Sequence, residues 1–247
     1  MTETINDSSI QDVSSFFIKP WQGNEIFGWS KSVMPQPLSL AEQIAGTVGE
    51  KILQGEYSPG QRIPEQLLSE AFHVSRGPVR EALMLLATER LVIIEPRRGA
   101  RVTQLSSEEV EEIFIIRASL VGLASRLFAQ KAEKNMLGEF EKAARYLIKI
   151  AGEDTDPDTY VRWSYALSLY TAKYAGLPRL FEMINSTARE AYRYARMSLE
   201  SKERRLESCD AWANIIELVK NRRLDEVEKA SRAIVEKTGQ AALLYLK

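Results

Sequence analysis

The stretch FHVSRGPVREAL, residues 72–83, constrains the fold of this 247-residue chain more than any other segment. Ser75 is of the residue type that caps a helix, and Pro78 is tolerated in a first helical turn, where N–H groups lack intrahelical partners. The apolar residues of the segment recur at helical spacing: Val79, Leu83 and Leu86. Arg76 and Arg80 stand one turn apart on the other side. The segment therefore predicts a helix with a buried back and a basic front.

The elements around this helix follow a recognisable order. A capping box opens a first helix over residues 39–55, and Pro64 suits the first position of a short second helix. Downstream, the runs 91–94 and 99–102 are β-prone and flank a hairpin tip at 95–98. Three helices and a hairpin within about 65 residues predict a winged helix-turn-helix.

The chain beyond Ser106 contains no convincing strand. Four glutamates between residues 108 and 112 suit a helix N-terminus, where the helix dipole favours acids. A series of apolar residues then keeps helical spacing: Ile113, Ile116, Leu120, Leu123 and Leu127. Further helices are expected over residues 134–151, 157–175, 178–200, 202–220 and 223–245. The pattern predicts an all-helical bundle of six or seven helices, and hence a mainly α protein.

We therefore expect three parts: an extension over residues 1–37, a winged helix-turn-helix domain over 38–104, and an all-helical domain over 105–247. The extension is rich in polar residues, which favours a flexible tail. Its aromatic residues leave open an arm that docks on the body or on a partner subunit: Phe16, Phe17, Trp21, Phe27 and Trp29.

Composition limits the protein class. Hydrophobic residues make up 45% of the chain and charged residues 27%, as in a globular protein, and no apolar run is long enough to span a bilayer. A single cysteine, Cys209, suits a reducing cytoplasm, which we expect to be its location. The net charge of −1 argues against wholesale polyanion binding. Residues 75–101, however, hold six arginines against three glutamates, which indicates a local basic patch.

Arginine on a recognition helix offers specific chemistry. Its planar fork can bridge guanine O6 and N7 in the major groove of double-stranded DNA. Arg97 and Arg98 at the hairpin tip could reach phosphates or the adjacent minor groove. The alternative is a solvated basic surface, which is the usual role of a charge cluster. The order of helices and hairpin around the cluster favours DNA binding.

Three motifs resemble those of the GntR family of bacterial transcription regulators. They are YSPGQRIPE at residues 57–65, VSRGPVREAL at 74–83 and RRGARV at 97–102, similar to the family patterns PGxxLxE, VSRxPVREAL and RGxxV. The segment EEIFIIR at residues 111–117 resembles the start of the helical effector domain, called FCD, of the FadR-type branch. The resemblance implies a winged helix-turn-helix followed by an effector-binding and dimerisation domain.

The resemblance also implies DNA contacts, residue by residue. The expected contacts are Ser75, Arg76, Gly77 and Arg80 on the recognition helix, Gln66 on the preceding helix, and Arg97, Arg98 and Gly99 in the wing. Three positions depart from the family pattern. Gly77 stands where threonine is commoner, Arg90 replaces a glycine before the first wing strand, and His73 replaces another glycine. Because histidine tolerates left-handed backbone better than most residues, His73 is interpreted as a turn residue.

Many effector domains of this type bind a divalent metal through one Asp and three His. In this chain, alignment on Leu177-Pro178 places Ser164 in the Asp position and Ser168 in the first His position. The two later His positions fall near Trp212 and Ile234. Because His73, the only histidine, lies in the other domain, we expect no metal and no cofactor.

An organic acid could take the place of the metal-bound ligand. Arg117 matches the arginine that the family pattern places at the cavity, and it could bind a carboxylate through two parallel hydrogen bonds. Its alternative role is a buried salt bridge between helices. Other candidate effector contacts are Ser164, Tyr165, Ser168, Arg189 and Arg193, with Tyr192 and Arg196 on the same later helix. A solvated surface is the alternative for the arginines of that helix. The aromatic residues Trp163, Tyr165, Tyr170 and Tyr174 are interpreted as packing.

These features predict a ligand-responsive regulator, with repression as the working assignment, that binds a palindromic operator as a homodimer. A second hypothesis is a DNA-binding dimer whose helical domain has lost ligand sensing. An enzyme is not expected, because no catalytic triad, phosphate loop or metal motif is present.

Overall fold

The computed structural model describes residues 38–153 and 156–246, which form two compact units, 38–106 and 107–246. The predicted arm or tail of residues 1–37 lies outside the described residues. Within the described ranges, no helix is both long enough and apolar enough to cross a membrane.

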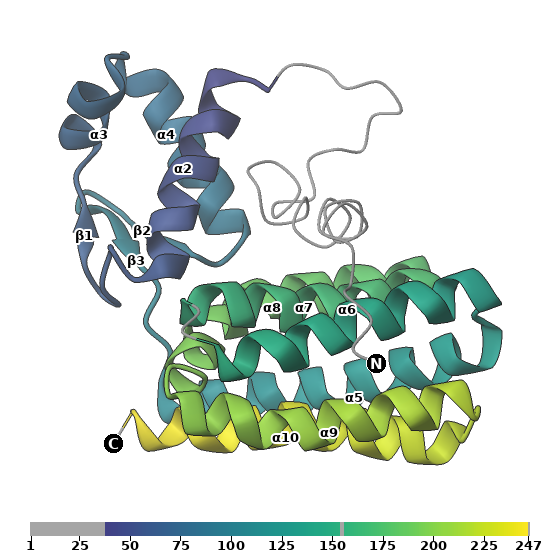
Figure 1. Ribbon diagram of the computed structural model, residues 1–247. Helices are drawn as coiled ribbons and strands as arrows, with labels where there is room; N and C mark the ends of the chain where they lie inside the picture. Colours follow the sequence, from purple (N-terminus) through teal and green to yellow (C-terminus); the bar gives the residue numbers. More distant parts are fainter. Residues whose placement is uncertain (1–37, 154–155, 247) are drawn as a thin grey trace. The chain divides into compact units, whose positions relative to one another are not determined.

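The first unit has the predicted order of three helices and a hairpin, with one additional strand (Figure 1). Its elements are α2 (Leu40–Gln54), β1 (Arg62–Ile63), α3 (Glu65–Phe72), α4 (Arg76–Thr88), β2 (Val92–Glu95) and β3 (Gly99–Val102). The predicted capping box is present at the start of α2: Ser39 accepts from the Glu42 N–H, and the Glu42 carboxylate accepts from the Ser39 N–H.

The sheet is antiparallel in the order β1-β3-β2. Ile63 pairs with Ala100, and Arg62 pairs with Arg101, which sets two cations directly opposite each other. Strand β1 was not predicted because two residues are too few to show alternation. The prediction for Pro64 was wrong by one position, because it is the N-cap of α3 and not its first residue.

The back of α4 is anchored in the core of this unit. Val79 and Leu86 have no exposed surface, and Leu83 is 2% exposed, which confirms the predicted apolar stripe. Helix α2 packs against α4 and contributes the buried residues Ile44, Val48 and Ile52. Since deleting one such side chain from a core costs about 2–5 kcal/mol, the rotation of α4 about its own axis is fixed.

The turn between α3 and α4 depends on left-handed backbone at His73. This residue has φ 54° and ψ 44°, and its N–H donates to the carbonyl oxygens of Ser69 and Glu70 at the end of α3. The interpretation of His73 as a turn residue is thus confirmed. A side chain in this conformation carries a steric penalty that glycine avoids.

We predict that His73→Gly raises the free energy of unfolding by about 0.5–1 kcal/mol, because it relieves the left-handed strain. His73→Ala is the matched control, since it removes the imidazole and keeps Cβ, and it should give no such gain. Denaturant titration followed by circular dichroism measures both. An equal gain for the two variants would contradict the strain argument.

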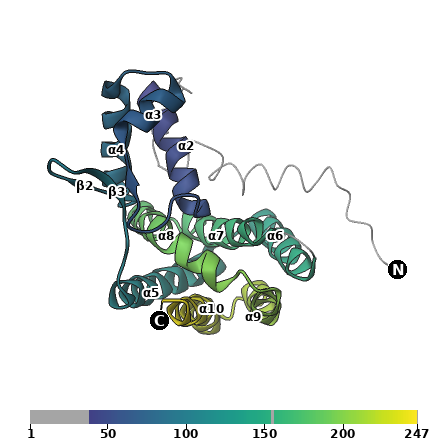
Figure 2. The same ribbon diagram turned by 90° about the vertical axis from the view of Figure 1, so that its left-hand side faces the viewer.

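Over the described residues 107–153 and 156–246, the second unit is a bundle of six helices, within the predicted six or seven. They are α5 (Ser107–Lys131), α6 (Lys134–Gly152), α7 (Pro157–Tyr174), α8 (Pro178–Ser198), α9 (Lys202–Lys220) and α10 (Leu224–Leu244). Figure 2 shows the bundle nearly end-on. Helix α5 lies beside α8 and α10, and α6 and α9 lie at the right of the view, away from α5.

Helices α5 and α10 make the most extensive contact of any helix pair in the bundle. A Cβ added at Gly239 would lie 2.6 Å from the Phe114 side chain, and one added at Gly122 would lie 3.0 Å from the Glu228 carbonyl oxygen. A side chain at position 239 would therefore force Phe114 to move, and one at position 122 would need a small shift of α10. Helix α5 buries one face against α10, α7 and α8.

Candidate nucleic-acid interface and effector pocket

The start of α4 presents the four residues of the predicted recognition surface to solvent. Ser75, Arg76, Gly77 and Arg80 are all exposed. Ser75 occupies the N-cap position with extended backbone, but its hydroxyl makes no capping hydrogen bond. Its hydroxyl therefore remains available as a donor and acceptor at the end of the helix.

Arg80 is held by the preceding helix. Its Nε donates to Glu65 Oε2 at 2.7 Å, while its side chain stays 64% exposed. Gln66 is exposed on α3, and its amide donates to Glu70 Oε1 at 3.0 Å. The Glu65 carboxylate thus fixes the direction of Arg80 and leaves its terminal NH groups accessible. An isolated surface ion pair of this kind contributes less than about 1 kcal/mol, so positioning is its main effect.

The wing tip is a tight turn of exposed basic residues. The Arg98 N–H donates to the Glu95 carbonyl at 3.0 Å, and both Arg97 (φ 64°) and Gly99 (φ 83°) are left-handed. Arg97, Arg98 and Gly99 are exposed. Arg90 is also left-handed (φ 57°) and closes the end of α4 by donating its N–H to Ala87, although the family pattern has glycine at this position.

The space beside Gly77 permits a larger residue. A Cβ at this position would meet only the Ser75 hydroxyl, at 4.0 Å. Packing therefore does not require glycine at this position. Because glycine has no side chain, it leaves the backbone between Arg76 and Arg80 accessible.

We predict that Gly77→Thr leaves the unfolding midpoint within about 2 °C of the parent protein. It should change the affinity for a DNA site, selected with the parent protein from a random duplex library, at least about fivefold. The side chain fits the protein, but it stands where the backbone would approach a base pair, and one altered base contact is worth about 1–3 kcal/mol. Thermal unfolding and fluorescence anisotropy measure the two effects. Unchanged affinity and sequence preference would argue against base contact at this position.

Arg117 is the most unusual charged residue of the helical unit. It is 2% exposed, its NH1 donates to the Ile184 carbonyl at 2.9 Å, and its Cζ lies 4.2 Å from the ring centroid of Tyr165. Burial lowers the pKa of Arg117 and raises that of Tyr165. No carboxylate of the described residues forms an ion pair with Arg117, so the alternative of an interhelical salt bridge is wrong within these ranges.

A small cavity begins one helical turn from this pair. Its volume is about 10 Å³. Its lining combines apolar side chains with hydroxyls: Val121, Ser125, Phe140, Leu167, Ser168, Thr171, Trp212, Ile215, Val219, Ser231 and Ile234. The buried indole N–H of Trp212 has no hydrogen-bond partner within the described part of the chain. The cavity thus offers donors, but in this conformation it has room for little more than a water molecule.

The cavity lining does not suit a transition metal. Ser168, Trp212 and Ile234 all line it, and these are the residues at or near three of the family's metal-binding positions. A hydroxyl, an indole and an aliphatic chain supply no imidazole, carboxylate or thiolate. The described residues also contain no group of three or more His, Cys, Asp or Glu placed to hold a metal. The residues present do not fit the metal that the family resemblance implies.

The other candidate effector residues are spread over α7 and α8. The Ser164 carbonyl accepts from the Ser168 hydroxyl at 3.3 Å, so Ser164 contacts Ser168 through its backbone. Arg193 donates to the Tyr194 hydroxyl at 3.0 Å and lies over its ring. Neither Arg189 nor Arg193 is among the described residues that line the cavity. The effector role of these two arginines stays a prediction.

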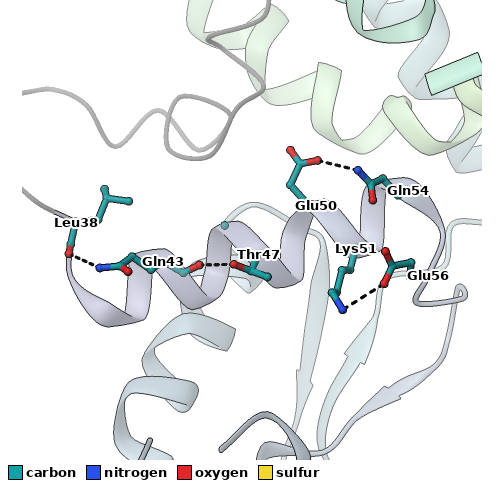
Figure 3. Close-up of a pocket in the computed structure, with 8 residues that line it drawn as sticks. Leu38, Gln43, Thr47, Glu50, Lys51, Gln54 and Glu56 are labelled. Carbon is teal, nitrogen blue, oxygen red and sulfur yellow. Dashed lines mark hydrogen bonds and ion pairs between the residues drawn. The ribbon is translucent and has the colours of Figure 1, made fainter. Parts of the chain in front are cut away.

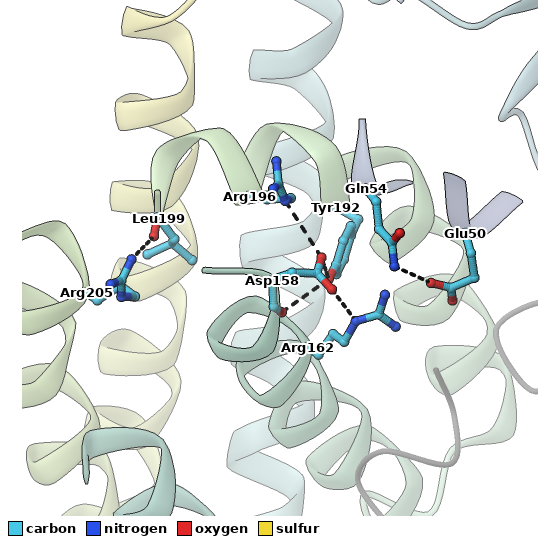
Figure 4. A network of polar contacts seen from close by, with 8 residues as sticks. All are labelled: Glu50, Gln54, Asp158, Arg162, Tyr192, Arg196, Leu199 and Arg205. Carbon is cyan, nitrogen blue, oxygen red and sulfur yellow. Dashed lines mark hydrogen bonds and ion pairs between the residues drawn. The ribbon is translucent and has the colours of Figure 1, made fainter. Parts of the chain in front are cut away.

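Asp158 forms a polar network that sequence reasoning missed (Figure 4). This buried carboxylate pairs with Arg162 of its own helix, accepts from the Tyr192 hydroxyl at 2.7 Å and lies 3.8 Å from Arg196 of α8. Tyr192 in turn packs edge-on against Tyr165. A continuous set of contacts therefore joins Arg117 to Asp158. The acid at the first turn of α7 was the available sequence signal.

The remaining aromatics of α7 pack as predicted. Trp163 lies against Tyr146, with ring centroids 4.6 Å apart, and Tyr170 lies between Phe128 and Tyr174. Tyr165 differs, because its ring faces a guanidinium.

A second hollow lies along the outer side of α2 (Figure 3). The hydrogen bonds and ion pairs drawn there stay within α2 and its flanks: Gln43 with Leu38, Thr47 with Gln43, Gln54 with Glu50, and Lys51 with Glu56. The groove is open to solvent and is lined by α2 and the residues next to it. We assign it no role.

Comparison with protein families matches both units. Residues 40–102 match the family described as bacterial regulatory proteins, gntR family, and residues 112–237 match the FCD domain. The second match covers about half of the chain.

Individual curated relatives share about a third or less of their residues with this chain over the matched regions. The chain is 34% identical over 128 residues to the uncharacterized HTH-type transcriptional regulator YdhC of Bacillus subtilis, covering 52% of this chain and 56% of that protein. It is 28% identical over 126 residues to the HTH-type transcriptional repressor GlaR of Escherichia coli, covering 51% and 57%. The chain thus spans little more than half the length of these curated relatives.

Solved structures support the fold. Escherichia coli McbR/YncC has a TM-score of 0.64 at 19% identity, covering 85% of this chain and 98% of that one. A GntR regulator from Rhodococcus sp. RHA1 gives the same TM-score at 21% identity, with the same coverage.

A winged helix-turn-helix unit with an exposed basic helix, followed by a six-helix bundle, defines a class of two-part regulatory proteins. Within this class, the chain belongs to the GntR family of bacterial regulatory proteins and carries an FCD domain.

Proposed function

We propose that this chain is a ligand-responsive transcription regulator, and not an enzyme, that binds a palindromic operator in double-stranded DNA as a homodimer. One observation carries the DNA-binding part: Arg76 and Arg80 are exposed on a helix whose opposite side is buried in the core. A two-fold dimer would present two such helices to two half-sites one turn of DNA apart.

Local charge supports this proposal better than net charge does. The chain as a whole carries −1, so nonspecific attraction to DNA cannot come from the total charge. The exposed cations Arg76, Arg80, Arg97 and Arg98 instead lie on the two elements that a winged helix places at the DNA. Binding should therefore weaken steeply with salt, since each phosphate contact releases a counterion.

We predict that Arg76→Ala and Arg80→Ala each weaken binding to the selected operator by roughly 5- to 150-fold, because each removes a guanidinium able to bridge a base pair. Arg145→Ala is the matched control: Arg145 is also an exposed helical arginine paired with a glutamate, but it lies in the other unit. Fluorescence anisotropy on labelled duplexes measures all three. Full sequence-specific affinity in both recognition-helix variants would overturn the proposed interface.

The operator can be obtained by selection from a random duplex library with the full chain. The homodimer proposal expects an inverted repeat whose half-site centres are about 10 base pairs, or a multiple of this spacing, apart. An enriched single half-site, or no enrichment, would contradict it.

The effector part of the proposal starts from Arg117. A buried guanidinium that pairs with none of the described carboxylates is costly, and a bound anion would satisfy it. We infer that the effector is a small organic acid that reaches Arg117 directly, without a metal, and that binding enlarges the adjacent cavity. The unpartnered Trp212 N–H could donate to the same ligand.

We predict that Arg117→Met retains the fold with a free energy of unfolding equal to or above that of the parent, since a similar-sized apolar side chain replaces an unpaired buried cation. The same variant should lose stabilisation by carboxylates, which at 100 times the dissociation constant is about 2.7 kcal/mol in the parent. Thermal unfolding with a panel of short organic acids measures both. Equal ligand shifts in parent and variant would remove Arg117 from the site.

The second candidate is a DNA-binding dimer whose helical domain no longer senses a ligand. The near-closed cavity and the loss of the family's metal-binding residues favour it. The two candidates differ in one result: if no acid of a broad panel raises the unfolding temperature of the parent, the non-sensing dimer is supported.

A further inference from the structure

The start of α9 holds two arginines at the end of a helix that favours acids. The helix begins at Lys202, after the N-cap Ser201, and Arg204 and Arg205 lie in its opening turns. Because the positive end of the helix dipole is at this terminus, cations there are unfavourable unless negative charge is close. Arg205 is 5% exposed, so bulk water compensates little of its charge.

The described carboxylates also compensate little of this charge. Arg205 forms no ion pair with any of them, and its Nη1 donates instead to the carbonyl oxygens of Leu199 at 3.0 Å and Glu200 at 2.7 Å (Figure 4). Arg204 Nη1 lies 3.7 Å from the carboxylate of Glu207, whose side chain is 70% exposed. The two guanidinium groups thus share one distant, solvated counter-charge.

Buried hydrogen-bond donors remain unused around these arginines. They are the Nε–H of Arg205, the Nη2 group of Arg204, and the hydroxyls of Tyr160 and Ser198. None of the four groups has a hydrogen-bond partner among the residues that the structure describes. Tyr160 belongs to α7, and Ser198 is the last residue of α8, directly before the Leu199 that Arg205 contacts. Three helices therefore contribute unpaired donors.

Tyr160 lies close to both guanidinium groups. Burial raises the pKa of Tyr160, and the nearby charges of Arg204 and Arg205 offset part of this effect, so the phenol keeps its proton and can donate. The Ser208 hydroxyl also acts on Tyr160, but no hydrogen bond of ordinary geometry joins them. Burial raises the pKa of the Cys209 thiol, which stays neutral. The groups that act on Tyr160 are therefore cationic or neutral.

We propose that Tyr160, Ser198, Arg204 and Arg205 form a binding site for one halide ion, with chloride as the natural occupant. A halide accepts hydrogen bonds from N–H and O–H groups alike, and it brings the negative charge that two guanidinium groups require. A water molecule could accept some of these hydrogen bonds, but it would bring no charge. Since the donors are buried, a monatomic ion suits them better than a metabolite does.

The ion would join α7, the end of α8 and the start of α9. The stability of the helical unit should therefore depend on chloride. This site is separate from the effector proposed at Arg117, and it does not rest on DNA binding.

The first test compares thermal unfolding in chloride and in the larger anion methanesulfonate, at equal ionic strength. The full chain carries Arg117→Met, so that an anion at Arg117 does not contribute. Chloride at ten times its dissociation constant should raise the folding equilibrium constant about elevenfold and the unfolding midpoint by roughly 3–6 °C. Adding Tyr160→Phe should weaken chloride binding roughly 10- to 150-fold, since it removes one hydrogen bond to a charged group.

Tyr170→Phe is the matched control in the same background. Tyr170 is also a buried tyrosine of α7, but its hydroxyl donates to Glu139 at 2.9 Å. This variant should lose stability and keep the full chloride shift. Circular dichroism confirms that all variants are folded. Equal chloride shifts in Tyr160→Phe and Tyr170→Phe, or no chloride shift in the background protein, would overturn the site.

The second test locates the ion in crystals of the full chain grown with bromide in place of chloride. The anomalous signal of bromide should give a peak within hydrogen-bonding distance of Arg205 Nε and the Tyr160 hydroxyl. An ordered water without anomalous signal at this position would refute the proposal. Bromide found at surface side chains alone would refute it too, as an adventitious ion only.

Discussion

The burial of Val79, Leu83 and Leu86 against α2 is the constraint on which the first unit depends. These side chains fix the rotation of α4, and this rotation determines what the helix presents to solvent. Once the apolar stripe is in the core, the side chains of Arg76 and Arg80 must point toward solvent. The exposure of these basic side chains is thus a consequence of hydrophobic packing. The left-handed turn at His73 sets where α4 begins, and the contact with Glu65 holds the side chain of Arg80.

The helical unit differs, because it buries the charge of Arg117 and none of the carboxylates that the structure describes neutralises it. Arg117 is held by a carbonyl oxygen and a tyrosine ring, and both are weaker partners than a carboxylate. The ring leads through Tyr192 to Asp158, where α7 and α8 meet in ion pairs. A ligand that drew Arg117 away from Tyr165 would therefore alter the contact that joins these two helices. These contacts connect Arg117 with the packing between α7 and α8.

Much of this structure could be predicted from local sequence, and the exceptions have physical causes. The capping residues, the helical spacing and the Glu-Pro-Arg-Arg turn were sufficient for α2, α4, the hairpin and the six bundle helices, because these features depend on neighbours in the chain. Strand β1 could not be found, because its two residues are ordered by pairing with β3. The apolar series of α5 predicted the helix correctly. Periodicity alone could not show that a different set of residues forms its most buried side. That no carboxylate of residues 38–153 and 156–246 pairs with Arg117 also depends on distances that residue spacing does not reveal.

The pairing of Arg62 with Arg101 across β1 and β3 has a consequence for how the first unit responds to its surroundings. Two guanidinium groups on directly opposite positions repel each other, and Glu95 offsets only part of this repulsion through its contact with Arg101. Like charges at opposite positions disfavour the pairing of β1 with β3, and this effect is largest at low ionic strength. Counterions screen this repulsion, and a row of phosphates would screen it better. A polyanion placed against this sheet would therefore favour the pairing of β1 with β3 as well as being attracted by the two cations.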